Sequence, residues 1–153
     1  RGYHSKIALI QNARSSYTPL MIEELKKARE NVLPFLKLGS HYLNRFIYNI
    51  VICTYRAELD YSSIIKYCDE ALNSLPKNHP KNIALRFNYF EMKLPSLIAK
   101  GDLGLAKDLA RETCKMMSVG KFNWHLAFIR RILVCFYTAE YQEAYDLHKE
   151  QEK

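Results

Sequence analysis

Apolar side chains recur at the period of an α-helix along nearly the whole chain, and this spacing most constrains the fold. In "SIIKYCDEALNSLP" a single stripe is formed by Ile64, Cys68, Ala71, Leu72 and Leu75. In "GLAKDLARETCKMM" a second stripe is formed by Ala106, Leu109, Ala110, Thr113 and Met117. Only five glycines and five prolines interrupt 153 residues, so few positions force a helix to break. The spacing therefore predicts an all-α fold.

Eight helices in four hairpins are expected from the stripes and from the signals between them. Thr18 followed by Pro19 is typical of a helix start, Asp60 is expected to cap a later helix, and Pro76 follows its end. The expected helices cover residues 4–15, 19–34, 40–58, 61–75, 80–100, 103–118, 122–138 and 141–151. The charged residues between the apolar stripes are expected to face solvent; they are Lys66, Asp69, Glu70, Lys107, Asp108 and Arg111. No low-complexity linker divides the chain, so one domain over 1–153 is expected.

A turn containing an acidic residue recurs between the expected helices, with spacings of 42 and then 38 residues. The acidic residues are Asp60, Asp102 and Glu140. When they are superposed, the residues four positions later fall into register; these are Ile64, Ala106 and Ala144. A small residue at that point, as at Ala106 and Ala144, lets two helices cross closely, because a larger side chain would push them apart. Ile64 departs from this pattern.

These turns resemble those of the tetratricopeptide repeat family over about residues 40 to 151. Tyr55, Ala71 and Pro76 match the family's first-helix aromatic, late alanine and closing proline, and "AKGDLGLAKDLA" matches its turn and early alanine. The spacing is longer than the family's period of about 34 residues, and Pro95 falls inside an expected helix. The resemblance implies a right-handed α-α superhelix of about four antiparallel hairpins, serving as a binding scaffold rather than an enzyme.

The formal net charge of +7 favours an anionic partner. Arg45, Asn49 and Arg56 share one face of the helix expected over 40–58, together with Cys53. In tetratricopeptide proteins the first helix of each hairpin lines a concave groove, so the resemblance implies that these three side chains and Arg86 bind an acidic or C-terminal carboxylate peptide. Arginine suits that role because its planar guanidinium can bind a carboxylate through two hydrogen bonds. An ordinary solvated helix face is the alternative interpretation.

No motif in the chain indicates catalysis, a metal or a cofactor. The histidines are far apart in sequence, at His4, His41, His79, His125 and His148, and none has metal-ligand spacing. The cysteines are scattered singly, at Cys53, Cys68, Cys114 and Cys135. We expect them to be small buried side chains in a reducing compartment. Most of the aromatic residues also fall in apolar stripes, which favours packing over base stacking.

The helix expected over 122–138 is apolar on two faces. One face carries Phe128, Ile132 and Cys135. The other face carries Leu126, Ile129, Leu133 and Phe136. A helix with two apolar faces requires two neighbours, and the last expected helix is too polar to cover both. The second face is therefore expected to contact another copy of the chain, forming a homodimer, or a further repeat.

The expected location is the cytoplasm, without membrane contact. No secretory signal is visible, and the most apolar run is broken by Arg130 and Arg131 and is too short to span a bilayer. Because the sequence starts at Arg1 rather than Met, it is expected to be part of a longer protein. Two alternatives to a protein- or peptide-binding scaffold are open: a sensor or oligomerisation region of a bacterial transcription regulator or signalling protein, and a nucleic-acid-binding helical repeat.

Overall fold

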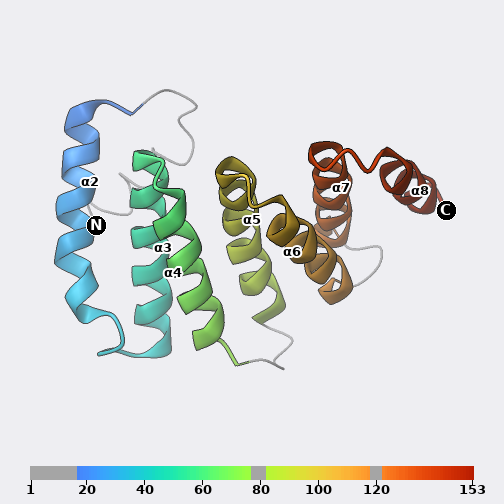
Figure 1. The fold of residues 1–153 in the computed structure, drawn as a ribbon. Coiled ribbons are helices and arrows are strands. Elements are labelled where there is room, and N and C mark those ends of the chain that lie inside the picture. The colour runs from blue at the N-terminus through green and yellow to red at the C-terminus, as the bar shows by residue number, and fades with distance from the viewer. Residues whose placement is uncertain (1–16, 77–81, 118–121) are drawn as a thin grey trace. The chain divides into compact units, whose positions relative to one another are not determined.

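A computed structural model describes residues 17–76, 82–117 and 122–153 (Figure 1). These described residues are 85% helical and contain no β-strand, which confirms the prediction of an all-α fold. The helix expected over 4–15 lies outside the described residues, as do His4 and His79. Within the described ranges no helix is long and apolar enough to cross a membrane.

The described helices follow the expected ones closely. They are α2 (Pro19–Val32), the 3₁₀ helix η1 (Leu33–Phe35), α3 (His41–Glu58), α4 (Tyr61–Ser74), α5 (Ile83–Lys100), α6 (Leu103–Met116), α7 (Phe122–Tyr137) and α8 (Tyr141–Gln151). Thr18 caps α2 as predicted, since its hydroxyl accepts a hydrogen bond from the backbone N–H of Met21. Helix α2 ends at Val32, two residues before the end predicted at Pro34. Proline has no N–H with which to continue the hydrogen-bond ladder of the helix.

One backbone turn occurs at three places, after α3, α5 and α7. A residue in the left-handed region begins each turn: Leu59 (φ 57°), Gly101 (φ 80°) and Ala139 (φ 56°). The next residue is the acidic one, and its backbone N–H donates to the carbonyl five positions earlier; the pairs are Asp60 to Tyr55, Asp102 to Leu97 and Glu140 to Cys135. This is the Schellman arrangement that satisfies the last carbonyls of a helix. The recurrence seen in the sequence therefore corresponds to a recurrent backbone conformation.

The residues four positions after each acid are buried in all three cases. Ile64 is 1% exposed, Ala106 0% and Ala144 4%. Of the three acidic side chains, that of Asp60 caps the following helix, accepting from the backbone N–H of Ser63 at 3.1 Å. The turn geometry is therefore carried by the backbone, and the capping side chain is an addition at one position.

The chain divides into two compact units, Arg1–Ala71 (unit 1) and Leu72–Lys153 (unit 2), with the boundary inside α4. In unit 1, α2 packs alongside α3 (Figure 1). Arg29 of α2 joins the two helices: its guanidinium bonds Glu58 at 3.1 and 3.2 Å and Thr54 at 3.3 Å, and lies 3.8 Å from the centre of the Tyr55 ring. Tyr55 in turn stacks on Tyr67 of α4. A nearly buried polar cluster thus links α2, α3 and α4.

In unit 2, α6 packs against both α5 and α7, and α7 packs against α8. Its core contains buried side chains from all four helices: Phe87, Cys114, Met117, Ala127, Phe128, Cys135, Ala144 and Leu147. Every residue of the two predicted apolar stripes is buried, which confirms that prediction. Of the six charged residues expected to face solvent, Lys66 and Asp108 are exposed. The other four, Asp69, Glu70, Lys107 and Arg111, are partly buried, and Lys107 and Arg111 form ion pairs with α8.

Candidate partner-binding groove

A groove of about 530 Å³ lies between α5 and α7 in unit 2. Its walls are mainly apolar: Leu94, Pro95, Ile98 and Ala99 come from α5, and Arg130, Leu133 and Tyr137 come from α7. Leu94 is buried, whereas Pro95, Ala99, Leu133 and Tyr137 are exposed. The groove therefore has a buried floor and open apolar sides. Concave, mostly apolar surfaces with a few polar groups are typical of binding sites.

Pro95 contributes an apolar wall without ending its helix. Proline lacks the N–H that would bond the carbonyl of Glu91, one turn earlier, yet α5 continues to Lys100. The next residue, Ser96, is buried and donates its hydroxyl to the carbonyl of Met92 at 3.1 Å, so its polar group is satisfied within the helix. The interior proline that departs from the tetratricopeptide pattern thus lies on the open side of α5, in the groove.

Arg130 is the one charged residue among those that line the groove. Its Nε lies 3.2 Å from both carboxylate oxygens of Glu91, and its Nη2 lies 3.1 Å from Oε2. The Arg130 side chain is 39% exposed and the Glu91 side chain 25%. This pair joins α7 to α5 and holds the guanidinium of a residue that lines the groove.

The structure places three of the four residues predicted for an interface on the open face of α7. Ile129 is 47% exposed, Leu133 39% and Phe136 56%. Leu126 is partly buried and packs against the core of unit 2. The face extends beyond the predicted set, because Phe136 contacts Tyr141 of α8, with ring centres 6.0 Å apart. Leu133 belongs both to this face and to the groove.

The residues predicted for a basic groove are divided between the two units. Arg45, Asn49 and Arg56 are exposed on α3 of unit 1, whereas Cys53, assigned to the same face, is buried. Arg86 belongs to unit 2, is partly buried, and donates from Nη2 to the carbonyl of Leu75 at 3.0 Å. This hydrogen bond satisfies a backbone carbonyl just after the end of α4. A common surface of the four residues stays a prediction.

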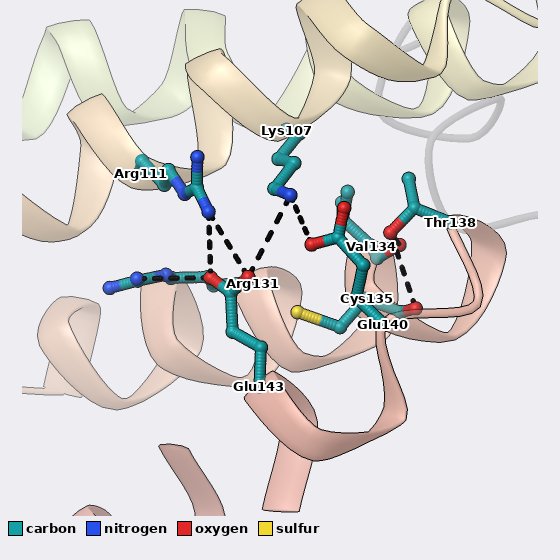
Figure 2. A network of polar contacts seen from close by, with 8 residues as sticks. All are labelled: Lys107, Arg111, Arg131, Val134, Cys135, Thr138, Glu140 and Glu143. Carbon is teal, nitrogen blue, oxygen red and sulfur yellow. Dashed lines mark hydrogen bonds and ion pairs between the residues drawn. The ribbon is translucent and has the colours of Figure 1, made fainter. Parts of the chain in front are cut away.

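A second cluster of charges lies between α6, α7 and α8 (Figure 2). Arg111 of α6 bonds the Glu143 carboxylate at 3.0 and 3.1 Å, and Arg131 of α7 bonds it at 3.2 Å. Lys107 pairs with Glu140 and lies 3.7 Å from Glu143. Figure 2 shows the side chains of Lys107 and Arg111 pointing from α6 toward the two carboxylates at the start of α8. The carboxylates are also well placed for the positive end of that helix.

The surrounding cations hold Glu143 in its charged form. Partial burial by itself raises the pKa of this carboxyl, but hydrogen bonds from Arg111 and Arg131 oppose it, and the pKa falls to about 2. Because the Glu143 carboxylate contacts three cations on two other helices, it connects α8 to both α6 and α7. The chemistry of this cluster is that of a structural ion-pair network.

The same cluster brings Cys135, Glu140 and Glu143 together, with candidate ligand atoms within 4.8 Å of one another. Three basic side chains already face the two carboxylates, so a metal cation would have to displace them. Burial raises the pKa of the Cys135 thiol and that of the Cys114 thiol, which favours the protonated form over a metal-binding or nucleophilic thiolate. The four cysteines are all buried thiols, as predicted.

Histidines do not contribute to any cluster of metal-ligating groups among the described residues. His148 pairs with Glu152 one turn later at 3.3 Å, and His125 lies against the ring of Trp124.

Comparisons with protein-family models, with curated proteins and with solved structures found no match.

Of the residues that line the groove, Leu133 belongs to the interface set predicted from the sequence, whereas Arg130 and Tyr137 on α7 and the four lining residues on α5 do not. The register of the turns contained the missing signal: superposing Asp102 on Glu140 aligns Pro95 with Leu133 and Ile98 with Phe136. Pro95 and Ile98 are therefore the α5 counterparts of two exposed apolar residues of α7. Their apolar character matches α7, the helix with which α5 shares the groove.

Proposed function

We propose that the chain is a non-enzymatic, tetratricopeptide-like scaffold module that binds a segment of a protein partner in the groove between α5 and α7. The observation that carries this proposal is the groove itself, with exposed apolar side chains, Leu133 and Tyr137, beside a buried floor. Exposed apolar surface of this kind usually marks an interface. The proposed architecture is a right-handed α-α superhelix of antiparallel hairpins, and the turn that occurs three times supports it.

The charged cluster supports the non-enzymatic part of the proposal. Its two carboxylates are engaged by Lys107, Arg111 and Arg131, and its thiol is buried. General acid-base catalysis needs a group whose pKa is close to the working pH, and the pKa of Glu143, about 2, is far from neutrality. The cluster is therefore better suited to holding α8 in place than to chemistry.

A peptide-display selection against the folded chain tests the proposal. We expect enriched peptides whose affinity falls by about tenfold or more in Leu133→Gln, since an apolar contact in the groove is replaced by a polar one. Leu105→Gln is the matched control, because Leu105 is 60% exposed on α6 and does not line the groove. Failure to enrich peptides, or equal binding by Leu133→Gln, would contradict the proposal. Far-UV circular dichroism of each variant checks that the fold is kept.

A further inference from the structure

The groove offers a partner one cationic group, Arg130, on an otherwise apolar surface. Arg130 uses Nε and Nη2 to bond Glu91, and its Nη1 has no hydrogen-bond partner among the described residues. The other lining side chains are apolar, apart from the hydroxyl of Tyr137: five are aliphatic, and Tyr137 contributes an aromatic ring. A partner that fits this surface must present apolar side chains, with an acceptor or an anion near Arg130.

The groove suits a helix better than an extended segment. An extended segment needs hydrogen-bond partners for its backbone groups, which usually come from the edge of a β-sheet. Here the walls are the sides of two helices, whose backbone groups are bonded within each helix, apart from the carbonyl of Glu91, to which Pro95 cannot donate. An α-helix satisfies its own backbone groups and needs only apolar contacts from the groove.

The spacing of the lining residues also fits a helix. They recur at i and i+4 on each wall, as Leu94 and Ile98 on α5 and as Leu133 and Tyr137 on α7. Rows of side chains spaced in this way are the ridges against which a third helix packs. From Leu94 to Ala99 the α5 wall extends by about 7.5 Å, room for two apolar side chains that are one turn apart on the partner.

Charge decides between the kinds of helix that could occupy the groove. The chain carries a formal net charge of +7, so a second copy is repelled, whereas an acidic segment is attracted. The unpartnered Nη1 of Arg130 gives that attraction a defined position in the groove. We infer that the occupant is an acidic amphipathic α-helix of another protein, with apolar residues at i and i+4 in the groove and a carboxylate beside Arg130. This inference rests on the proposed function and specifies the partner of the same groove.

Four synthetic peptides of about 14 residues, N-acetylated and C-amidated, test the inference by fluorescence anisotropy. The first is an acidic helix with leucines along one face and glutamates along the other. The second replaces glutamate with glutamine, the third replaces leucine with alanine, and the fourth has a central proline that breaks the helix. We expect saturable binding of the first, about tenfold weaker binding of the third and fourth, and about threefold weaker binding of the second.

Variants of the Arg130–Glu91 pair test where the carboxylate binds. Glu91→Gln frees the guanidinium, so we expect it to bind the acidic peptide about threefold more tightly while the glutamine peptide is unchanged. The double variant Glu91→Gln, Arg130→Gln keeps the net charge at +7, so the difference between these two peptides should shrink to the part that the net charge contributes, below the difference seen with the unmodified chain. Leu133→Gln should weaken every peptide that binds, and Leu105→Gln should weaken none. If Glu91→Gln leaves the preference for the acidic peptide unchanged, Arg130 is not the binding group and the inference fails.

Other results separate this inference from the proposed function. If display-selected peptides bind in a manner that depends on Leu133 but the acidic helix does not bind, or binds as well with its central proline, the inference fails and the groove still binds partners. If no peptide of any class binds, both fail. Light scattering over a concentration series identifies the remaining occupant: a dimer that Leu133→Gln dissociates would place a second copy of the chain in the groove and overturn the inference.

Discussion

At the three turns after α3, α5 and α7, one left-handed residue makes each helix end possible. Glycine adopts that conformation without penalty, whereas a side chain with a Cβ costs about 1 kcal/mol there. The chain has glycine at one of these positions, Gly101, and leucine and alanine at the others, Leu59 and Ala139. The same backbone turn is therefore made with different amounts of local strain.

We expect Gly101→Ala to lower the free energy of unfolding by about 1 kcal/mol and Ala139→Gly to raise it by about 0.5 to 1 kcal/mol. No heavy atom lies within 4 Å of a Cβ added at Gly101, so the effect comes from the backbone angle and not from a clash. Urea denaturation followed by circular dichroism measures both changes. Equal stability of all three proteins would show that these residues do not occupy the left-handed region in solution.

Two arginines of unit 1 are expected to differ strongly in their effect on stability. Arg29→Met removes the partner of a Glu58 carboxylate whose side chain is 15% exposed, so we expect a loss of about 2 to 4 kcal/mol. Arg56 is exposed on α3, so Arg56→Met should change stability by less than about 0.5 kcal/mol. Thermal unfolding of the two variants gives the comparison. A large loss for Arg56→Met would mean that this arginine is structural and not available to a partner.

At the scale of single elements, α8 is held to the other helices of unit 2 by few apolar contacts and several ion pairs. Its buried side chains are Ala144 and Leu147, and its first turn is held by Lys107, Arg111 and Arg131. Because Glu143 has a lowered pKa in the folded protein, its ionised form stabilises the fold above the ordinary pKa of a glutamate, near 4.5. That contribution is lost as the pH falls from about 5 toward about 2.

Glu143→Gln should therefore be less stable than the unmodified chain at pH 7, by about 1 to 2 kcal/mol, and the difference should shrink as the pH approaches 2. The expected value is below the full effect of the pKa change because the side chain is 24% exposed and solvent screens its charges. Denaturation at a series of pH values measures the difference. Glu112→Gln is the matched control on exposed surface of α6, and a constant difference across this pH range would contradict the assignment.

At the scale of the whole molecule, the net charge of +7 attracts any anionic partner. The apolar groove, by contrast, binds only a partner whose shape fits it. The two contributions respond differently to salt. Screening weakens attraction between charges, but it leaves the burial of apolar surface almost unchanged. Ionic strength can therefore separate specific binding in the groove from general attraction to anions.

We expect the affinity of the acidic amphipathic peptide to fall about three- to tenfold when the salt concentration rises from about 0.05 to about 0.5 M, and the affinity of its glutamine version to change little. Anisotropy titrations at several salt concentrations measure the slope. A nucleic acid would show a much steeper dependence because its binding releases counterions. If single-stranded RNA binds more tightly than the peptide at moderate salt, the nucleic-acid alternative is favoured.

The sequence by itself determined the elements of this protein. Helix positions, the buried stripes and the three acidic turns depend on residues three to five positions apart, and such local relations can be read from the order of residues. The α7 residues Ile129, Leu133 and Phe136 were likewise recognised as an apolar face beyond the one used for packing.

Only the tertiary structure decided which of these faces work together. Arg130 and Glu91 are 39 residues apart, and Arg111 and Glu143 are 32 apart, so their pairing depends on how whole helices are aligned. For this reason the sequence did not show that Lys107 and Arg111, which lie opposite an apolar stripe, form ion pairs with α8. Nor did it show that Pro95, an interior proline of α5, lines the groove. Local spacing sets which face of a helix is apolar, but which helix packs against it is decided by burial summed over the whole unit.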